Sequence, residues 1–104
     1  MIKKTSKKGP IMRLYIDDVR DVPEGYDLAR NSSAAIELMK YRLSVGTPYT
    51  HVSFDHDLGD DDTTRRVVMW MIEHEHPPIS WNVHSANPVG KEWLEGTLSR
   101  YLTA

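Results

Sequence analysis

Polar side chains follow three apolar stretches of this 104-residue chain, at the point where each stretch ends. The stretches are residues 12–16, 51–54 and 79–83, and the polar residues after them are Asp17, Asp18, Asp55, His56, Asp57, His84, Ser85 and Asn87. Carboxylates bind divalent cations, and histidine transfers protons near neutral pH. Carboxylates that lie close together also repel one another unless a cation or a shared proton neutralises them. The pattern therefore predicts metal-assisted or acid–base chemistry.

The elements that would bring these residues together are parallel strands alternating with helices. The predicted strands are residues 12–16, 27–29, 51–54 and 79–83. Their alternation with helical patterns is typical of right-handed βαβ units. Ligand-binding residues of such sheets lie outside the carboxyl ends of the strands. We therefore expect a small three-layer α/β sandwich with a mainly parallel sheet of about four strands. The first connection is too short for a helix, so one face should be thinly covered.

Capping signals mark where three helices should begin. Asn31 or Ser32 is a side-chain cap for the first helix, which Gly46 should end. Asp61, Asp62 and Thr63 are the candidate caps of the second helix, where the two acids also suit the helix dipole. Asn87, followed by proline, is expected to cap the third. The predicted inner face of this last helix consists of Trp93, Leu94, Leu98, Tyr101 and Leu102.

Composition indicates one small soluble domain. The chain is 39% hydrophobic and 27% charged, and it has no cysteine, which excludes disulfides and thiolate metal sites. No apolar stretch approaches the roughly 20 residues of a membrane span, and residues 1–11 do not form a secretory signal. We therefore expect a cytoplasmic protein without a membrane partner.

The charge is divided unequally between the first eleven residues and the rest. Residues 1–11 carry four lysines and no acid, which leaves nine basic and fifteen acidic side chains, or −6, for residues 12–104. We expect residues 1–11 to form a disordered basic tail, favoured as a solubilising segment or a stretch before an alternative start at Met12 over an arm that meets nucleic acid. Residues 12–104 should form the domain. Its acidity suits a cation, or a small phosphate carried by a cation.

Three sequence strings resemble a known family. Residues 14–20 read LYIDDVR, residues 54–59 read FDHDLG, and residues 84–90 read HSANPVG. An acid pair, a later aspartate and a small hydroxyl residue in this order resemble the site of response-regulator receiver domains. The strings themselves resemble the cyclic-phosphate-processing receiver-like family, a compact group from bacteria and phages. The resemblance extends over nearly everything from Met12 onward. It implies a flavodoxin-like fold and an activity on cyclic or terminal phosphates.

The resemblance and the residue chemistry together suggest a metal site. We expect Asp17, Asp18 and Asp55 to hold Mg²⁺ or Mn²⁺, with Asp57 as a further ligand that could instead offer its backbone carbonyl or cap a turn. Asp55 matches the phosphate acceptor of receivers, so it could also be the nucleophile.

Other residues of the same strings are candidates for substrate binding and proton transfer. Arg20 and Ser85 are expected to position the phosphate. His84 or His56 would protonate the leaving oxygen or activate water, and both occupy positions where signalling receivers usually have apolar residues. Asn87 is better explained as a helix cap than as a ligand, and this cap would leave N–H groups of the last helix free to bind an anion at the cluster.

Two patterns that invite a functional interpretation have simpler ones. His74 and His76 are separated by one residue on a helix, so they point to different faces and are better explained as a solvated helix end. The three tryptophans fall within or beside apolar stripes, which favours packing over base stacking.

The sequence leaves two classes of function open. The first is a Mg²⁺-dependent phosphoric ester hydrolase, a phosphohydrolase or phosphodiesterase acting on a small phosphorylated ligand or a nucleotide terminus. The alternative is a non-enzymatic receiver-like binding or switch module, of phage or bacterial origin, that binds a nucleotide signal or a host protein. Loss of turnover on removal of the histidines would favour the enzyme.

Overall fold

The computed structural model describes residues 12–104, so the predicted disordered tail lies outside the described residues. The described elements are, in chain order, β1 (Arg13–Ile16), β2 (Asp27–Ala29), α1 (Ser32–Ser44), β3 (His51–Phe54), α2 (Arg65–Glu73), β4 (Ser80–Val83) and α3 (Pro88–Tyr101). All four predicted strands and all three predicted helices are present. None of these helices is long and apolar enough to cross a membrane.

The four strands form one parallel sheet in the order β2-β1-β3-β4. The register pairs Ile16 with Ala29 on one side and with Phe54 on the other. Phe54 is paired in turn with Val83. The last residues of all four strands are thus aligned, which gathers the loops after the strands at one edge of the sheet. The receiver-like α/β class expected from the sequence is confirmed.

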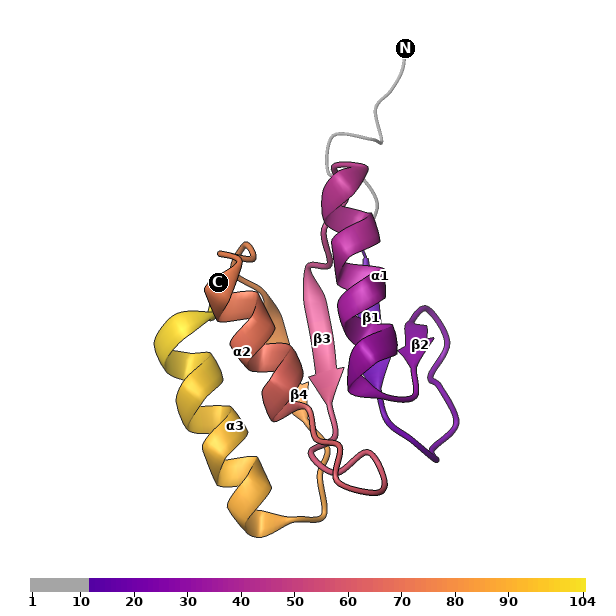
Figure 1. Ribbon diagram of the computed structural model, residues 1–104, viewed down its shortest axis with the longest axis vertical. Helices are drawn as coiled ribbons and strands as arrows, with labels where there is room; N and C mark the ends of the chain where they lie inside the picture. Colours follow the sequence, from indigo (N-terminus) through magenta and orange to yellow (C-terminus); the bar gives the residue numbers. More distant parts are fainter. Residues whose placement is uncertain (1–11) are drawn as a thin grey trace.

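The described helices lie on one face of the sheet (Figure 1). The connections through α1 and α2 both advance in the same direction across the sheet, and right-handed crossovers then place both helices on the same side. Helix α3 packs against α2 and β4. The thin cover expected for one face is found. The second helix layer of the expected three-layer sandwich is absent from residues 12–104, because no helix lies between β1 and β2.

The two faces of the sheet differ in chemistry. On the helix face, the fully buried Leu14, Ile16, Val52 and Phe54 join the hydrophobic core with the inner sides of the helices. Residues alternate between faces along a strand, so the intervening positions point to the opposite, open face. Those positions are Arg13, Tyr15, Leu28, His51, Ser53, Ser80 and Asn82. The open face is therefore mainly polar and aromatic.

Two helix caps were predicted correctly and one was not. Asn31 Oδ1 accepts a hydrogen bond from the backbone N–H of Ala34, and Asn87 caps α3 in the same manner. Helix α2 begins after Thr64, without a side-chain cap. Asp62, expected to cap α2, instead accepts hydrogen bonds from the Ser32 backbone N–H at 2.8 Å and the Ser32 hydroxyl at 2.6 Å. Its carboxylate thus supports the start of α1, because the loop before α2 reaches across to that helix.

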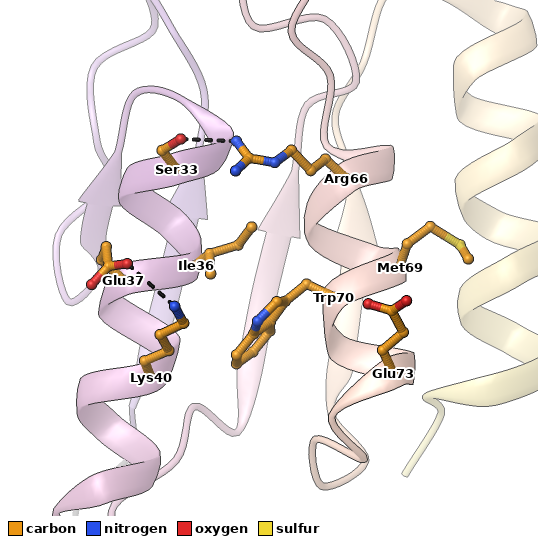
Figure 2. Close-up of a pocket in the computed structure, with 8 residues that line it drawn as sticks. All are labelled: Ser33, Ile36, Glu37, Lys40, Arg66, Met69, Trp70 and Glu73. Atoms are coloured by element: carbon orange, nitrogen blue, oxygen red, sulfur yellow. Dashed lines mark hydrogen bonds and ion pairs between the residues drawn. The ribbon is translucent and has the colours of Figure 1, made fainter.

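Helices α1 and α2 enclose a surface groove of about 340 Å³ (Figure 2). Arg66 of α2 donates hydrogen bonds to the hydroxyls of Ser32 and Ser33 across one end of it. The indole of Trp70 points into the groove and stacks on His74, in agreement with the packing role expected for tryptophan. One inner-face prediction on α3 is wrong, since Tyr101 is 56% exposed.

Candidate functional site

Asp17, Asp55 and His84 meet at the carboxyl edge of the sheet. They directly follow β1, β3 and β4, whose ends are aligned. One ligand atom from each lies within 4.8 Å of the others, and within residues 12–104 this is the one group of three such side chains with that spacing. We call it the acid–histidine cluster. Asp17 is fully buried and Asp55 is 8% exposed.

The carboxylate of Asp17 is fully occupied by hydrogen bonds. Its Oδ1 accepts from the backbone N–H groups of Val19 and Arg20, at 2.9 and 2.8 Å. Its Oδ2 accepts from Arg20 Nη1 at 2.7 Å and from His84 Nε2 at 2.9 Å. Burial raises the pKa of Asp17, but these four hydrogen bonds to the charged form outweigh it and lower the pKa to about 2. Asp17 is thus an anion at neutral pH.

The carboxylate of Asp55 has fewer partners. Its Oδ1 accepts from the backbone N–H of His56 at 2.8 Å, and its Oδ2 has only a 3.4 Å contact with Arg20 Nη1. Burial raises the pKa of Asp55, the His56 N–H opposes this, and the negative charge of Asp17 raises it further. Asp55 Oδ2 therefore has lone pairs that no short hydrogen bond occupies, and the Asp55 carboxylate is more basic than an ordinary aspartate.

The guanidinium of Arg20 contacts both carboxylates. Its Nη1 lies 2.7 Å from Asp17 Oδ2 and 3.4 Å from Asp55 Oδ2. Its side chain is 43% exposed, so it can reach solvent without unfolding the site. Arg30 donates hydrogen bonds to the backbone carbonyls of Asp17 and Arg20, which holds the loop after β1. The carboxylate repulsion that the sequence suggested is compensated in this structure by Arg20.

His84 uses both ring nitrogens. Its Nε2 lies 2.9 Å from Asp17 Oδ2, and its Nδ1 lies 2.8 Å from the hydroxyl of Ser53. The ring stacks on Tyr15, with centroids 4.5 Å apart and planes 2° from parallel. Burial lowers the pKa of His84, and the hydrogen bond to Asp17 only partly opposes this. The ring is therefore held against the sheet and faces Asp17 through a single nitrogen.

Two of the predicted carboxylates lie outside the cluster. Asp18 is half-buried and its Oδ2 lies beside Gly59. Asp57 is exposed and contacts Asn87 Nδ2 at 3.0 Å and His56 Nδ1 at 2.9 Å. These hydrogen bonds, the one from Asn87 first, lower the pKa of Asp57. The structure joins Asp57 to the start of α3 and not to Asp17.

The ring of His56 is buried beneath α3. Its Nδ1 contacts Asp57, and its Nε2 accepts from Arg65 Nε at 2.9 Å. A β-carbon at Gly90 would overlap the His56 ring, so glycine is needed at this position of α3. The imidazole is 5% exposed and both nitrogens are engaged. This environment fits a residue that anchors α3 rather than one that meets a substrate.

Ser85 and Asn87 form the turn that leads into α3. The Ser85 hydroxyl accepts from the Asn87 backbone N–H at 3.0 Å. Asn87 Oδ1 accepts from the backbone N–H of Gly90 at 3.0 Å, so the cap role expected for it is present. Ser85 is half-buried and adjoins His84.

The sequence analysis missed the residues behind His84. Ser53 and Tyr15 lie within strands, and their side chains point to the open face, where Ser53 bonds to Nδ1 of the imidazole and Tyr15 stacks on its face. A signal was available, because Ser53 lies between the apolar Val52 and Phe54. A polar residue at a buried strand position indicates a specific partner.

Comparison with known proteins agrees with this architecture. The family model described as "Cyclic-phosphate processing Receiver domain" matches residues 12–100. The matched range contains the whole acid–histidine cluster and all four strands. No curated protein matches the chain. Because the family model covers most of the sequence, this chain belongs to the cyclic-phosphate processing receiver domain family.

Proposed function

We propose that this protein is a metal-dependent phosphoric ester hydrolase that acts on cyclic or terminal phosphates of nucleotides. The observation that supports this most directly is the meeting of Asp17, Asp55 and His84 at the carboxyl edge of the sheet, with Arg20 between the carboxylates. An anion-binding arginine, a basic carboxylate and a histidine in one place are the groups that phosphate ester hydrolysis needs.

The donor set fits Mg²⁺ or Mn²⁺. Asp55 Oδ2 has lone pairs that no strong hydrogen bond occupies, and hard cations prefer carboxylate oxygens. Asp17 Oδ2 can join only if Arg20 or His84 releases it, since that oxygen already accepts from both. Arg20 is the more exposed of the two donors. When bound, the metal would neutralise negative charge that develops on the phosphate oxygens.

The side chains of the cluster have distinct parts in this proposal. Arg20 moves from Asp17 to the phosphate, where its planar guanidinium can bind two oxygens. Asp55, with its raised pKa, takes a proton from the attacking water. His84 directs its Nε2–H at the cluster, where it can donate a hydrogen bond that stabilises the charge on a leaving ribose oxygen, and that oxygen takes its proton from water. Asp17 stays ionised and holds the imidazole in place.

The partner we propose is a small phosphorylated ligand or the end of a nucleotide chain. The site lies in loops at the edge of a small acidic domain, a charge that disfavours a long polyanion. Any contact with nucleic acid would involve the basic residues 1–11, which lie outside the described structure.

A panel of phosphate esters tests the proposal. The full chain is incubated with 2′,3′-cyclic, 3′,5′-cyclic and terminal nucleotide phosphates, with Mg²⁺ or Mn²⁺, and the products are followed by phosphorus NMR. We expect hydrolysis of at least one class that chelation by EDTA stops. Asp55→Asn should lower kcat on that substrate by about 10²-fold or more, because an amide cannot act as a base.

Asp61→Asn is the matched control, since Asp61 is an exposed loop carboxylate outside the cluster. It should retain the kcat of the parent protein. Absence of turnover on every ester, together with binding of the same ligands in calorimetry, would replace the hydrolase with a binding module.

A further inference from the structure

An unbroken series of side-chain hydrogen bonds crosses the open face of the sheet and ends at the acid–histidine cluster. We call it the histidine ladder. Its members, from the far end to the cluster, are Ser80, His51, Asn82, Ser53 and His84. The four contacts are 2.7, 2.9, 2.9 and 2.8 Å long, and a fifth, of 2.9 Å, joins His84 to Asp17.

The carboxylate of Asp17 sets the direction of the hydrogen bonds near the cluster. Asp17 Oδ2 can only accept, so a neutral His84 must carry its hydrogen on Nε2. His84 Nδ1 then has a lone pair, and the Ser53 hydroxyl must donate to it. The Ser53 oxygen accepts in turn from Asn82 Nδ2, at 2.9 Å. Each step follows from the one before it.

The same logic continues to the far end of the ladder. Asn82 Oδ1 accepts from His51 Nε2, so the imidazole of His51 must carry its hydrogen on Nε2. His51 Nδ1 then accepts from the hydroxyl of Ser80, at 2.7 Å. All donors in the ladder point toward Asp17. One arrangement of hydrogens satisfies these five contacts with both imidazoles neutral, although the Ser80 hydroxyl also lies 3.3 Å from a second acceptor, the Thr50 carbonyl.

Ser53 is the buried member of the ladder, whereas Asn82 and Ser80 are exposed and both histidines are half-buried, so the pairing is strictest at Ser53. Ser53 is 2% exposed, although no described helix covers its face of the sheet, because the neighbouring side chains of the ladder and Tyr15 surround it. A buried hydroxyl or ring nitrogen left without a partner costs about 1–3 kcal/mol. Reversing the hydrogen on His84 would set a ring lone pair against Asp17 Oδ2 and would remove the acceptor of the Ser53 hydroxyl hydrogen.

We propose that Ser53, Asn82 and His51 are positioning residues that fix His84 in the tautomer with its hydrogen on Nε2. This inference rests on the proposed function and sharpens it: His84 faces the phosphate site as a hydrogen donor, and metal ligation is left to the carboxylate oxygens. His51, at the opposite end of β3 from the cluster, thereby influences a reaction that it does not touch.

The tautomer can be measured in the full chain without substrate. Two-bond proton–nitrogen correlation spectra of histidine rings distinguish a hydrogen on Nε2 from one on Nδ1. We expect both His84 and His51 to carry it on Nε2 near neutral pH, and His84 to keep it there when Mg²⁺ is added. A hydrogen on His84 Nδ1 in either condition would overturn the proposal.

Asn82→Asp breaks the ladder with almost no change in shape. A carboxylate cannot donate to the Ser53 oxygen, so the Ser53 hydroxyl should turn toward it and His84 Nδ1 should gain a hydrogen. On the best ester, kcat should fall at least about tenfold, the usual effect of losing a partner that orients a functional histidine, while KM changes little. Asn31→Asp is the matched control, because Asn31 is exposed and aspartate also caps helices.

His51 supplies the test at a distance. Glutamine can place an amide N–H near the position of His51 Nε2, so His51→Gln should keep the parent tautomer of His84 and its kcat. His51→Phe removes the donor to Asn82 and should let both tautomers of His84 appear. An unchanged His84 spectrum in both Asn82→Asp and His51→Phe would overturn the proposal even if hydrolysis is found. The parent tautomer without hydrolysis would overturn only the proposed function.

Discussion

Arg20 and His84 donate to the same oxygen, Asp17 Oδ2, at 2.7 and 2.9 Å. A cation that binds this oxygen must therefore take the place of a donor that is already there. Because the Arg20 side chain is 43% exposed and His84 is packed against Tyr15, the arginine is the donor that can leave. A cation that binds Asp17 Oδ2 would thus displace Arg20, and the displaced guanidinium would be free to bind a phosphate.

Removal of the Arg20 charge should increase the effect of a cation on stability. Without metal, Arg20→Gln should lower the free energy of unfolding at neutral pH by about 1 kcal/mol, a modest value because the guanidinium is partly exposed. Millimolar Mg²⁺ or Mn²⁺ should then raise Tm more in the variant than in the parent, since the carboxylates no longer have a competing partner. Differential scanning fluorimetry measures both effects.

Arg100→Gln provides the control for that experiment, because it removes the same charge from an exposed position on α3. Its metal-induced change in Tm should equal that of the parent. An equal change in Arg20→Gln as well would mean that Arg20 and the cation do not compete for Asp17.

Asp17 should stabilise the fold at neutral pH and cease to do so in acid. Its pKa in the folded protein is about 2, below the ordinary 3.8, so its contribution is complete above about pH 4 and is lost as the pH falls toward 2. Asp17→Asn should cost at least about 2 kcal/mol at pH 7, and the difference from the parent should shrink below pH 4. Urea unfolding at pH 7, 4 and 3 tests this. A difference that does not vary with pH would contradict the assignment.

The imidazole of His76 should make the protein less stable in mild acid. His76 is 4% exposed, its Nδ1 donates to the carbonyl of Pro77, and its Nε2 has no partner. Burial lowers its pKa below 6.5, so only the unfolded chain gains a proton as the pH falls through that value. Stability should decrease accordingly from pH 7.5 to 5.5. His76→Asn keeps a donor for Pro77 and should show a smaller decrease, measured by urea unfolding across this range.

Two glycines of α3 should respond in opposite ways to alanine. Gly90 lies against the His56 ring, so Gly90→Ala should cost about 1–3 kcal/mol by overpacking. Gly96 has open space around it, so Gly96→Ala should add about 0.5–1 kcal/mol through helix propensity. Chemical unfolding of both variants compares them on the same helix. A neutral Gly90→Ala would show that α3 can move away from His56.

Local signals in the sequence were sufficient for most of the fold. The third strand was predicted with the bounds it has, His51–Phe54, because apolar residues stop abruptly at Asp55. Asn31 and Asn87 cap helices because a cap depends on a few neighbouring residues. Asp62 has the same local chemistry but binds Ser32, thirty residues earlier, a contact that no local pattern contains.

The candidate site was predicted in part for a similar reason. Convergence of Asp17, Asp55 and His84 follows from strand ends in a parallel sheet. Membership of the cluster depends also on side-chain direction, which places Asp17 inside while Asp18 lies near Gly59. The position of Arg20 between two carboxylates depends on the path of a loop, which sequence alone does not define.

The histidine ladder also bears on how the chain selects its strand pairing. Its rungs join β3 and β4 through side chains, and its last member reaches Asp17 directly after β1, in addition to the backbone hydrogen bonds of the sheet. A slip of one residue in β3 would turn His51 and Ser53 toward the helices and bring Val52 and Phe54 to the open face. Mispaired sheets would therefore lose the core and the ladder together. Folding to a single alignment and preparation of the functional histidine thus depend on the same side chains.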